Sequence, residues 1–213
     1  PAGQSTQLIV GATPESDLHI IKLSEKLYKK MHLKRVYYSA YMSVNKDSRL
    51  PSLSSPALLR EHRLYQADWL LRFYGFESSE ILNETSPFLD KDLDPKTCWA
   101  TRNLNIFPIE INSAEYEKLI RTPGIGTTSA KKIVKARRLS NLTIDDLKKF
   151  GVVLKRAKYF ITANGKTPYK YKYTEEEIKK NILNENKTAK SRNASSDYEQ
   201  LFLFDNNDKT TPQ

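Results

Sequence analysis

The sequence predicts an α/β unit at residues 1–48, connecting helices at 49–107, an all-α domain at 108–165 and a flexible tail at 166–213. Two short β-rich runs flank a helical pattern near the start, which is the order of a βαβ unit. Two amphipathic patterns farther along are separated by Pro-Gly-Ile-Gly, which forces a tight reversal between helices. The final stretch is rich in Asn, Lys and Ser and has too little apolar content to offset its ordering entropy.

The α/β unit is predicted from two apolar runs and the helix between them. Residues 7–12, QLIVGA, and 34–44, KRVYYSAYMSV, are typical of strands. Thr13-Pro14-Glu15 combines an N-cap, a first-turn proline and an early acid, which predicts a helix start. One βαβ unit pairs its strands in parallel but cannot close a sheet, so we expect neighbours from a longer protein or from another chain. The inward face of the helix is expected at Ile20, Leu23, Leu27 and Met31.

The connecting segment predicts two helices. The first begins at Ser55-Pro56 and ends near Gly75, and the second is capped by Asp94-Pro95 and runs through Leu104. In the tail, TEEEIKKNIL at 174–183 is a further helix candidate. One stripe of the first helix is expected to carry Leu58, His62, Tyr65, Trp69 and Phe73.

Positive charge is concentrated in one part of the chain. Of a net charge of +10, the segment 108–172 contributes 15 Lys and Arg against 5 Asp and Glu, while the remaining residues balance. A concentrated basic segment is typical of a nucleic-acid surface, because neutralising phosphates supplies most non-specific affinity. The alternative is a solvated basic face without a partner.

Composition also narrows the class of protein. No apolar run approaches the roughly 18 residues that span a bilayer, and no secretory signal opens the chain. The single cysteine, Cys98, excludes an internal disulfide framework and fits a reducing, cytoplasmic compartment. The three histidines, His19, His32 and His62, show no metal-ligand spacing.

The most specific motif is INSAEYEKLIRTPGIGTTSAKKIVKARR at 111–138, which resembles the helix-hairpin-helix motif. Asn112 is expected to cap the first helix, and Gly124 and Gly126 to permit positive φ and a close backbone approach. The second helix would then open at the turn, with its free N–H groups and positive dipole end directed at an anion. An ordinary αα-hairpin is the alternative. The residues expected to contact DNA are Gly124, Ile125, Gly126, Thr128, Ser129, Lys131 and Lys132.

A weaker copy of the motif follows at 143–161, TIDDLKKFGVVLKRAKYFI. Thr143 is its predicted N-cap, Gly151 its turn, and Lys155 and Arg156 lie outside the apolar face. Tandem hairpins of this kind grip phosphates across a minor groove, which predicts binding to double-stranded DNA without reading base sequence.

Several stretches together resemble the C-terminal half of a family of DNA modification or repair radical-SAM proteins. They are PAGQSTQLIVGATPESD, RVYYSAY, REHRLYQADWLLRFYGF, PGIG and GVVLKRAKYFIT. The resemblance covers most of residues 1–165 and implies the closing βαβ part of a partial barrel, S-adenosylmethionine and a 4Fe–4S cluster. The family holds the cluster on a Cys-x-x-x-Cys-x-x-Cys loop, and the sequence contains no such loop. Because Cys98 cannot replace three thiolates, we do not expect this chain alone to bind the cluster or to be active.

The resemblance also implies residues near the cofactor. Polar side chains of the βαβ unit would hold S-adenosylmethionine or the substrate, although strand-end Ser and Thr are also simple caps. No catalytic residue is identified, and His62 with Glu61 and Asp68 is read as the polar rim of a helix. The expected cofactor-binding residues are Gln4, Thr6, Thr13, Glu15 and Ser39.

Near the end of the chain, QLFLF resembles the peptide by which bacterial repair proteins bind the sliding clamp. Gln200 would hydrogen-bond at the pocket mouth while Leu201, Leu203 and Phe204 supply the apolar contacts. The alternative is that this peptide folds back onto its own protein.

Three functions are consistent with these patterns. The first is the DNA-binding part of a radical-SAM enzyme, and the second is a non-enzymatic adaptor that recruits partners through its tail. The third is an RNA-binding accessory factor.

Overall fold

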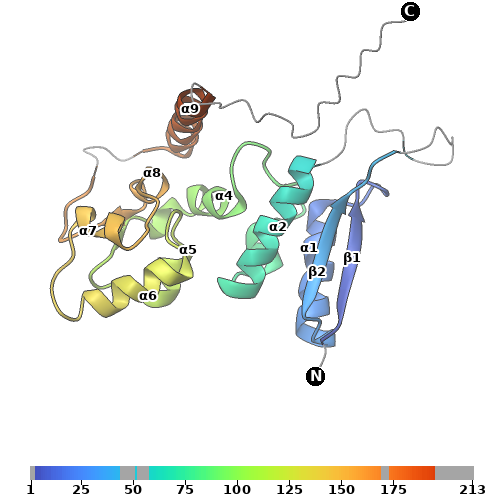
Figure 1. Ribbon diagram of the computed structural model, residues 1–213, viewed down its shortest axis with the longest axis horizontal. Helices are drawn as coiled ribbons and strands as arrows, with labels where there is room; N and C mark the ends of the chain where they lie inside the picture. Colours follow the sequence, from blue (N-terminus) through green and yellow to red (C-terminus); the bar gives the residue numbers. More distant parts are fainter. Residues whose placement is uncertain (1–2, 44–50, 52–57, 169–172, 195–213) are drawn as a thin grey trace, which may run out of the picture.

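The computed structural model describes residues 3–43, 51, 58–168 and 173–194. Its strands are β1 Ser5–Val10, β2 Arg35–Ala40, β3 Ile109–Glu110 and β4 Ile161–Thr162. Its helices are α1 Asp17–Met31, α2 Leu58–Phe73, α3 Ser78–Ile81, α4 Pro95–Arg102, the 3-10 turn η1 Leu104–Ile106, α5 Tyr116–Arg121, α6 Thr127–Ala136, α7 Ile144–Lys149, α8 Leu154–Ala157 and α9 Glu175–Ala194. Figure 1 shows β1, β2 and α1 at one end of the long axis, α5 to α8 at the other, and α2 and α4 between them.

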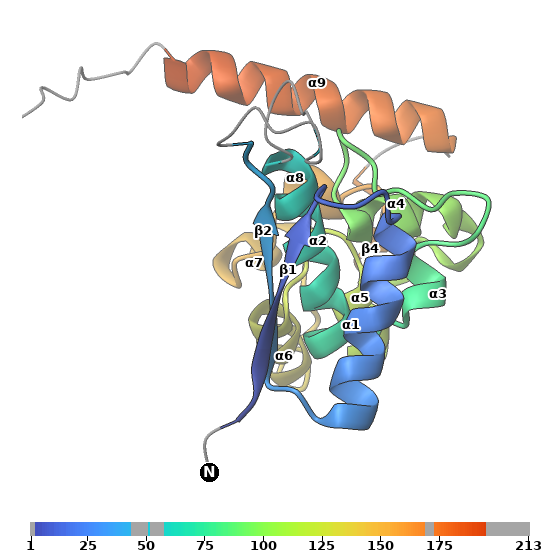
Figure 2. The same cartoon turned by 90° about the vertical axis from the view of Figure 1, so that its right-hand side faces the viewer.

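The first three elements form the expected βαβ unit. β1 and β2 pair in parallel, with Ser5 opposite Arg35 and Val10 opposite Ala40. Figure 2 shows α1 running beside this two-stranded sheet. The predicted helix start at Thr13 is wrong by three residues, because the hydroxyl of Ser16 accepts from the His19 N–H at 3.2 Å and caps the helix.

The predicted inward faces of α1 and α2 are both rotated in the structure. On α1 the buried residues include Leu18, Ile20 and Ile21, while Leu23 and Met31 are exposed. On α2 the buried residues are Leu64, Ala67, Asp68 and Leu70, and four members of the predicted stripe are exposed: Leu58, His62, Trp69 and Phe73.

A buried carboxylate explains the orientation of α2. Asp68 is buried and accepts hydrogen bonds from the hydroxyls of Tyr28 on α1 and Tyr38 on β2. Arg72, one turn along α2, pairs with the same carboxylate at 3.5 Å. Because a buried carboxylate must be hydrogen-bonded, this network fixes which face of α2 meets the βαβ unit.

Other helix predictions are confirmed with different bounds. Asp94 caps α4 by accepting from the Thr97 N–H at 3.2 Å, but α4 ends at Arg102, and Leu104 begins the 3-10 turn instead. Gly75 has φ of 66°, which ends α2 as expected. The tail candidate belongs to α9, whose Ile178 and Ile182 are buried.

The described residues bury two hydrophobic cores. The first extends without a break from β1 through α4 and includes Ile178 and Ile182 of α9, so it crosses the expected boundary at residue 48. The second holds α5 to α8 together, beginning at Ile109. Tyr74 and Phe107 pack against both cores and join them.

The described residues thus form a mostly helical protein with two small parallel sheets and a hairpin region. β3 pairs with β4 in parallel, Ile109 opposite Ile161, which brings together the two ends of the hairpin region. In the described part of the chain, no helix combines the length and apolar character needed to cross a membrane.

Candidate nucleic-acid interface

The first hairpin consists of α5, a turn at Pro123–Gly126 and α6. Gly124 has φ of 78°, as expected, whereas the expectation of positive φ for Gly126 is wrong, because it has φ of −92° and serves as the N-cap of α6. Asn112 does not cap α5, which begins four residues later. Its side chain instead bonds both backbone groups of Leu142, accepting at 2.8 Å and donating at 3.1 Å, and so ties the entry of α5 to the exit of α6.

The second hairpin, α7 and α8, repeats the first at an interval of 27 residues. Gly151 occupies the place of Gly124 and has φ of 81°. Thr143 caps α7 through a capping box, as predicted. The repeat extends to buried positions. At the same interval, Val152 is equivalent to Ile125, Ala157 to Ala130 and Phe160 to Ile133, and all six are buried.

The two turns pack against each other. The Val153 N–H donates to the Gly124 carbonyl oxygen at 2.9 Å, and a Cβ on Gly124 would lie 2.4 Å from the Val153 oxygen. From the other side, the Ser129 hydroxyl lies 3.7 Å from the Cβ position of Gly151. Ser129 is therefore only 7% exposed and faces the second turn, so its hydroxyl is not placed to hold phosphate. Ile125 likewise contributes its side chain to the core.

The N-terminus of α6 keeps free amide groups. Thr128 is exposed in the first turn of this ten-residue helix, and within the described residues the N–H groups of Gly126, Thr128 and Ser129 have no hydrogen-bond partner. The Tyr74 hydroxyl lies close to this end of α6, 3.7 Å from the Cβ position of Gly126. Free amides at the positive end of a helix dipole bind anions, so this turn has the geometry of a phosphate site.

A row of cations continues from this turn along α6. Within the part of the chain that the structure describes, the four cations of this row are exposed and form no ion pair. Neighbouring cations are paired instead: Arg121 with Glu80, Lys148 with Asp145 and Arg156 with Asp94. Lys131 and Lys132 are among the DNA contacts predicted from the sequence, whereas Lys135 and Arg138 are separated from the surrounding paired cations only by the structure. We call this row the α6 basic stripe: Lys131, Lys132, Lys135 and Arg138.

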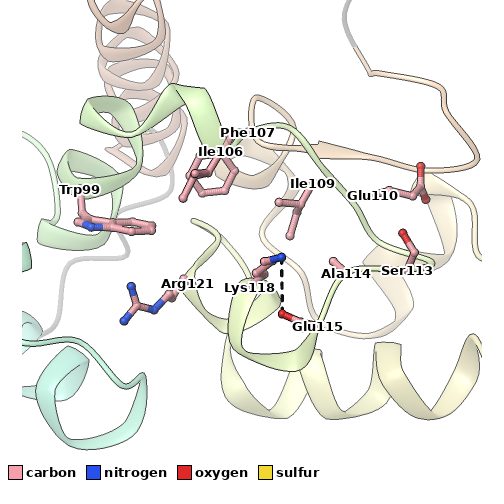
Figure 3. Close-up of a pocket in the computed structure, with 10 residues that line it drawn as sticks. All are labelled: Trp99, Ile106, Phe107, Ile109, Glu110, Ser113, Ala114, Glu115, Lys118 and Arg121. Atoms are coloured by element: carbon pink, nitrogen blue, oxygen red, sulfur yellow. Dashed lines mark ion pairs between the residues drawn. The ribbon is translucent and has the colours of Figure 1, made fainter.

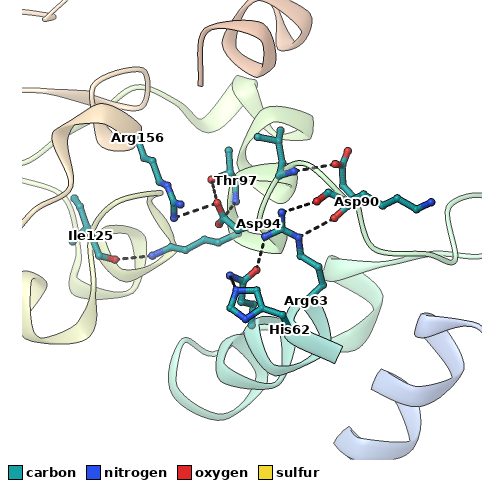
Figure 4. A network of polar contacts seen from close by, with 11 residues as sticks. His62, Arg63, Asp90, Asp94, Thr97, Ile125 and Arg156 are labelled. Carbon is teal, nitrogen blue, oxygen red and sulfur yellow. Dashed lines mark hydrogen bonds and ion pairs between the residues drawn. The ribbon is translucent and has the colours of Figure 1, made fainter. Parts of the chain in front are cut away.

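The other predicted DNA contacts in the second hairpin are divided. Gly151 and Lys155 are exposed, whereas Arg156 pairs with Asp94 at 3.3 Å (Figure 4). The four-residue helix α8 is too short to build a strong dipole, and the Val153 N–H at its start is already bonded to Gly124. The first hairpin therefore offers the better phosphate site.

A buried lysine supports the first turn from behind. Lys96 Nζ donates to the Ile125 carbonyl oxygen at 2.6 Å and lies 4.6 Å from the centre of the Tyr74 ring. Burial, together with the nearby Arg156, lowers the pKa of Lys96 to about 7, although Asp94 opposes the shift. Sequence reasoning missed Tyr74 and Lys96, because neither lies near the motif along the chain.

The expected cofactor residues fall into two groups. Gln4 and Thr6 lie at the start of β1, whereas Thr13 and Glu15 follow its end and Ser39 lies near the end of β2. The five therefore do not surround one pocket within the described chain. Among the described residues, Glu15 Oε2 and the Tyr41 hydroxyl are buried without a hydrogen-bond partner, and both follow the carboxyl ends of the parallel strands.

The residues that the structure describes do not fit an iron–sulfur cluster. Nowhere among them do three His, Cys, Asp or Glu side chains gather as a metal site. Burial and the carboxylates of Asp90 and Asp94 raise the pKa of Cys98 to about 12, so its thiol stays protonated. The clamp-like peptide Gln200–Phe204 lies outside the described residues.

A separate pocket of about 540 Å³ lies beside α5 (Figure 3). Its floor is apolar, with Trp99, Phe107 and Ile109, and the rim carries Lys118 paired to Glu115 at 3.5 Å. Arg121 at the rim is held by Glu80 at 2.6 Å and by the Gly75 carbonyl oxygen at 2.6 Å. This arginine therefore ties α5 to the first core rather than facing a phosphate.

Comparison with known proteins supports the hairpin assignment. Residues 105–153 match the family described as "Helix-hairpin-helix motif". No curated protein and no solved structure matches the chain. The matched segment holds both turns and the free amides of α6, so this region is a helix-hairpin-helix motif, which indicates nucleic-acid binding.

Proposed function

We propose that the chain is the C-terminal part of a radical-SAM protein of DNA modification or repair and that it binds the backbone of double-stranded DNA through α6, without sequence specificity. The DNA-binding part of this proposal rests on one observation. Within the described residues, the amides of Gly126, Thr128 and Ser129 have no partner, and they lie next to the α6 basic stripe. Both features lie on the first hairpin, inside or close to the segment that matches the helix-hairpin-helix family.

This surface suits phosphates rather than base edges. Main-chain amides and lysines hold phosphate oxygens at any sequence, whereas base reading needs side chains that reach into a groove. The helix α6 is anchored by Ile133 in the second core and by the Gly124 carbonyl oxygen, which accepts from Val153 in the opposite turn, so its amides are fixed before DNA arrives. We therefore expect affinity that depends steeply on salt and only weakly on sequence.

Thr128→Asp tests the phosphate site directly. A carboxylate in the first turn of α6 favours the helix dipole, so the variant should fold at least as stably as the original protein. The same carboxylate occupies the anion site and repels phosphate. Duplex affinity should therefore fall at least about tenfold, which is the effect of losing one charge-assisted hydrogen bond. Fluorescence anisotropy with a labelled duplex measures the affinity, and thermal melting measures the stability.

Thr128→Ala is the matched control, because it removes the hydroxyl and keeps the amides. It should bind within about threefold of the original protein, since an exposed neutral hydroxyl contributes at the low end of the hydrogen-bond range, about 0.5 kcal/mol. Equal duplex affinity of Thr128→Asp and Thr128→Ala would show that α6 does not hold phosphate.

The enzyme half of the proposal is supported by the βαβ unit. Within the described residues no strand pairs with the outer edge of β1, and Ile9 and Tyr37 are exposed on one face of the sheet, which supports a place in a larger barrel. The outer edge of β2 is occupied instead, because Tyr65 and Glu61 of α2 accept from the N–H groups of Tyr38 and Ala40. The unpartnered Glu15 Oε2 and Tyr41 hydroxyl follow the carboxyl ends of the strands, and they support binding of a polar ligand such as S-adenosylmethionine there.

The cluster itself needs thiolates that the described residues do not supply. The decisive observation is therefore the coding sequence before Pro1. Three cysteines there at Cys-x-x-x-Cys-x-x-Cys spacing support the enzyme, whereas their absence supports a DNA-binding adaptor without chemistry.

The alternative function is a non-enzymatic DNA-binding adaptor. It rests on the peptide Gln200–Phe204, for which we propose the bacterial sliding clamp as partner. Deleting Gln200–Phe204 should abolish co-migration with the clamp in gel filtration and leave duplex affinity unchanged. A lower melting temperature of the deletion variant, with co-migration unchanged, would instead support a peptide that folds back on the protein.

A further inference from the structure

A second cavity opens directly beside the first hairpin turn. Its volume is about 390 Å³, within the roughly 300–1,000 Å³ typical of small-ligand sites. It lies between α2, the start of α4 and α8. We call it the Trp69 groove, and its main lining residues are His62, Gln66, Trp69, Tyr74, Lys96 and Arg156.

One wall of the groove is an exposed aromatic platform. The Trp69 side chain is 52% exposed, although it is one of the largest apolar groups in the chain. Phe73 lies against it one turn along α2, with ring centroids 4.9 Å apart, and so limits its rotation. A rigid, half-exposed indole is a surface on which a flat ring can stack.

The opposite wall carries polar and cationic groups. Arg156 is partly exposed and held by Asp94 at 3.3 Å, and Lys96 lies deeper in the groove. On the same wall as Trp69, Gln66 and His62 lie about one and two turns before it on α2, and their side chains contact each other at 3.0 Å. These groups can bond the edge of a ring that stacks on Trp69.

The groove is continuous with the proposed phosphate site. Tyr74 lines it, and its hydroxyl lies 3.7 Å from the Cβ position of Gly126, the N-cap of α6. Lys96 lines it and also donates to the turn at Ile125. Two of its walls are therefore built by the residues that support the hairpin turn, so a nucleotide next to a bound phosphate has a cavity within reach.

We propose that the Trp69 groove receives one unstacked nucleotide of the DNA strand whose phosphate lies on α6. The inference rests on the proposed DNA binding and adds a substrate class to it, namely DNA with an unpaired base. A paired base cannot use this groove, because both of its faces are already stacked in the duplex. The unpaired base stacks on Trp69, and its edge meets His62 and Gln66.

Three labelled DNAs test the proposal: a fully paired duplex, the same duplex with one bulged thymine, and the same duplex with a single-stranded overhang. The protein should bind at least one of the last two about tenfold more tightly than the paired duplex, because stacking on an aromatic side chain has roughly that effect. Preference for the bulge indicates a base flipped out of a helix, and preference for the overhang indicates a strand end.

Variants then assign the preference to the groove. Trp69→Ala should lose it and bind all three DNAs with the affinity of the original protein for the paired duplex, whereas Trp69→Phe should keep most of it. Leu58→Ala is the matched control, because Leu58 is 60% exposed on the same helix and does not line the groove. The unpaired DNA should also quench tryptophan fluorescence, since Trp99, the other tryptophan, is buried.

Two results overturn this inference alone. One is salt-dependent binding to the paired duplex with no preference for unpaired DNA, and the other is an undiminished preference in Trp69→Ala. Absence of binding to all three DNAs overturns the proposed function as well, so the two failures are distinguishable.

Discussion

The Val153 N–H donates a 2.9 Å hydrogen bond to the carbonyl oxygen of Gly124 and so joins the turns of the two hairpins. The contact requires glycine at 124, because its φ is 78° and a Cβ there would overlap the Val153 oxygen. Because of this bond, the amide at the start of α8 already has a partner, whereas among the described residues the amides at the start of α6 have none. It explains why two similar hairpins have different roles.

Gly124→Ala should destabilise the protein by about 2–4 kcal/mol, because left-handed strain adds to an overlap with backbone atoms. Gly165→Ala is the control, since Gly165 has φ of 70° but no atom within 4 Å of its Cβ position. It should cost only roughly 1–2 kcal/mol from strain. Urea denaturation measures both, and equal losses would show that the turn–turn contact is unimportant.

Single alanine substitutions in the α6 basic stripe should reduce the salt dependence of DNA binding. Each of Lys131, Lys132, Lys135 and Arg138 that contacts a phosphate accounts for about 0.9 of the slope of log affinity against log salt concentration. Lys148→Ala is the control, because Lys148 pairs with Asp145 at 3.0 Å. Slopes that match the control in all four variants would place DNA elsewhere.

Lys96 should make the stability of the protein depend on pH. Its pKa of about 7 in the folded state is below the ordinary 10.5, so between these values the unfolded state binds more protons. The free energy of unfolding should therefore rise from pH 7 to pH 9, by at most about 1.4 kcal/mol per pH unit.

Lys96→Met removes this titrating group and keeps a similar apolar stem, so its stability should rise less over the same range. Urea denaturation at pH 6 to 9 compares the two proteins. Parallel pH profiles would mean that Lys96 stays charged in the folded state.

Arg121 should act on stability rather than on DNA. It bonds both carboxylate oxygens of Glu80 and lies 4.5 Å from the Phe76 ring centre, so Arg121→Ala should lower the free energy of unfolding by roughly 2 kcal/mol. Its salt slope in duplex binding should match that of the original protein. Lys118→Ala, which removes an exposed pair with Glu115, should change stability by less than about 0.5 kcal/mol. A smaller slope for Arg121→Ala would mean that this arginine reaches the phosphates.

Local signals in the sequence predicted much of the secondary structure. Asp94 and Thr143 cap helices because a short side-chain oxygen next to a helical pattern satisfies free amides wherever that pattern lies. The failures concern orientation. Trp69 and Leu64 are both apolar and both on α2, and nothing in their spacing tells which one faces the βαβ unit, because that choice depends on Asp68 bonding Tyr28 and Tyr38.

The sequence by itself determined the βαβ unit, the Pro-Gly-Ile-Gly reversal and the concentration of positive charge, since each depends on residues close together in the chain. Only the tertiary structure decided which cations are free, that Ser129 is covered by the second turn, and that Tyr74 and Lys96 support the first. The reason is physical: pairing, burial and the occupation of an amide depend on partners that are distant in sequence, and these become neighbours only when the two cores have packed together.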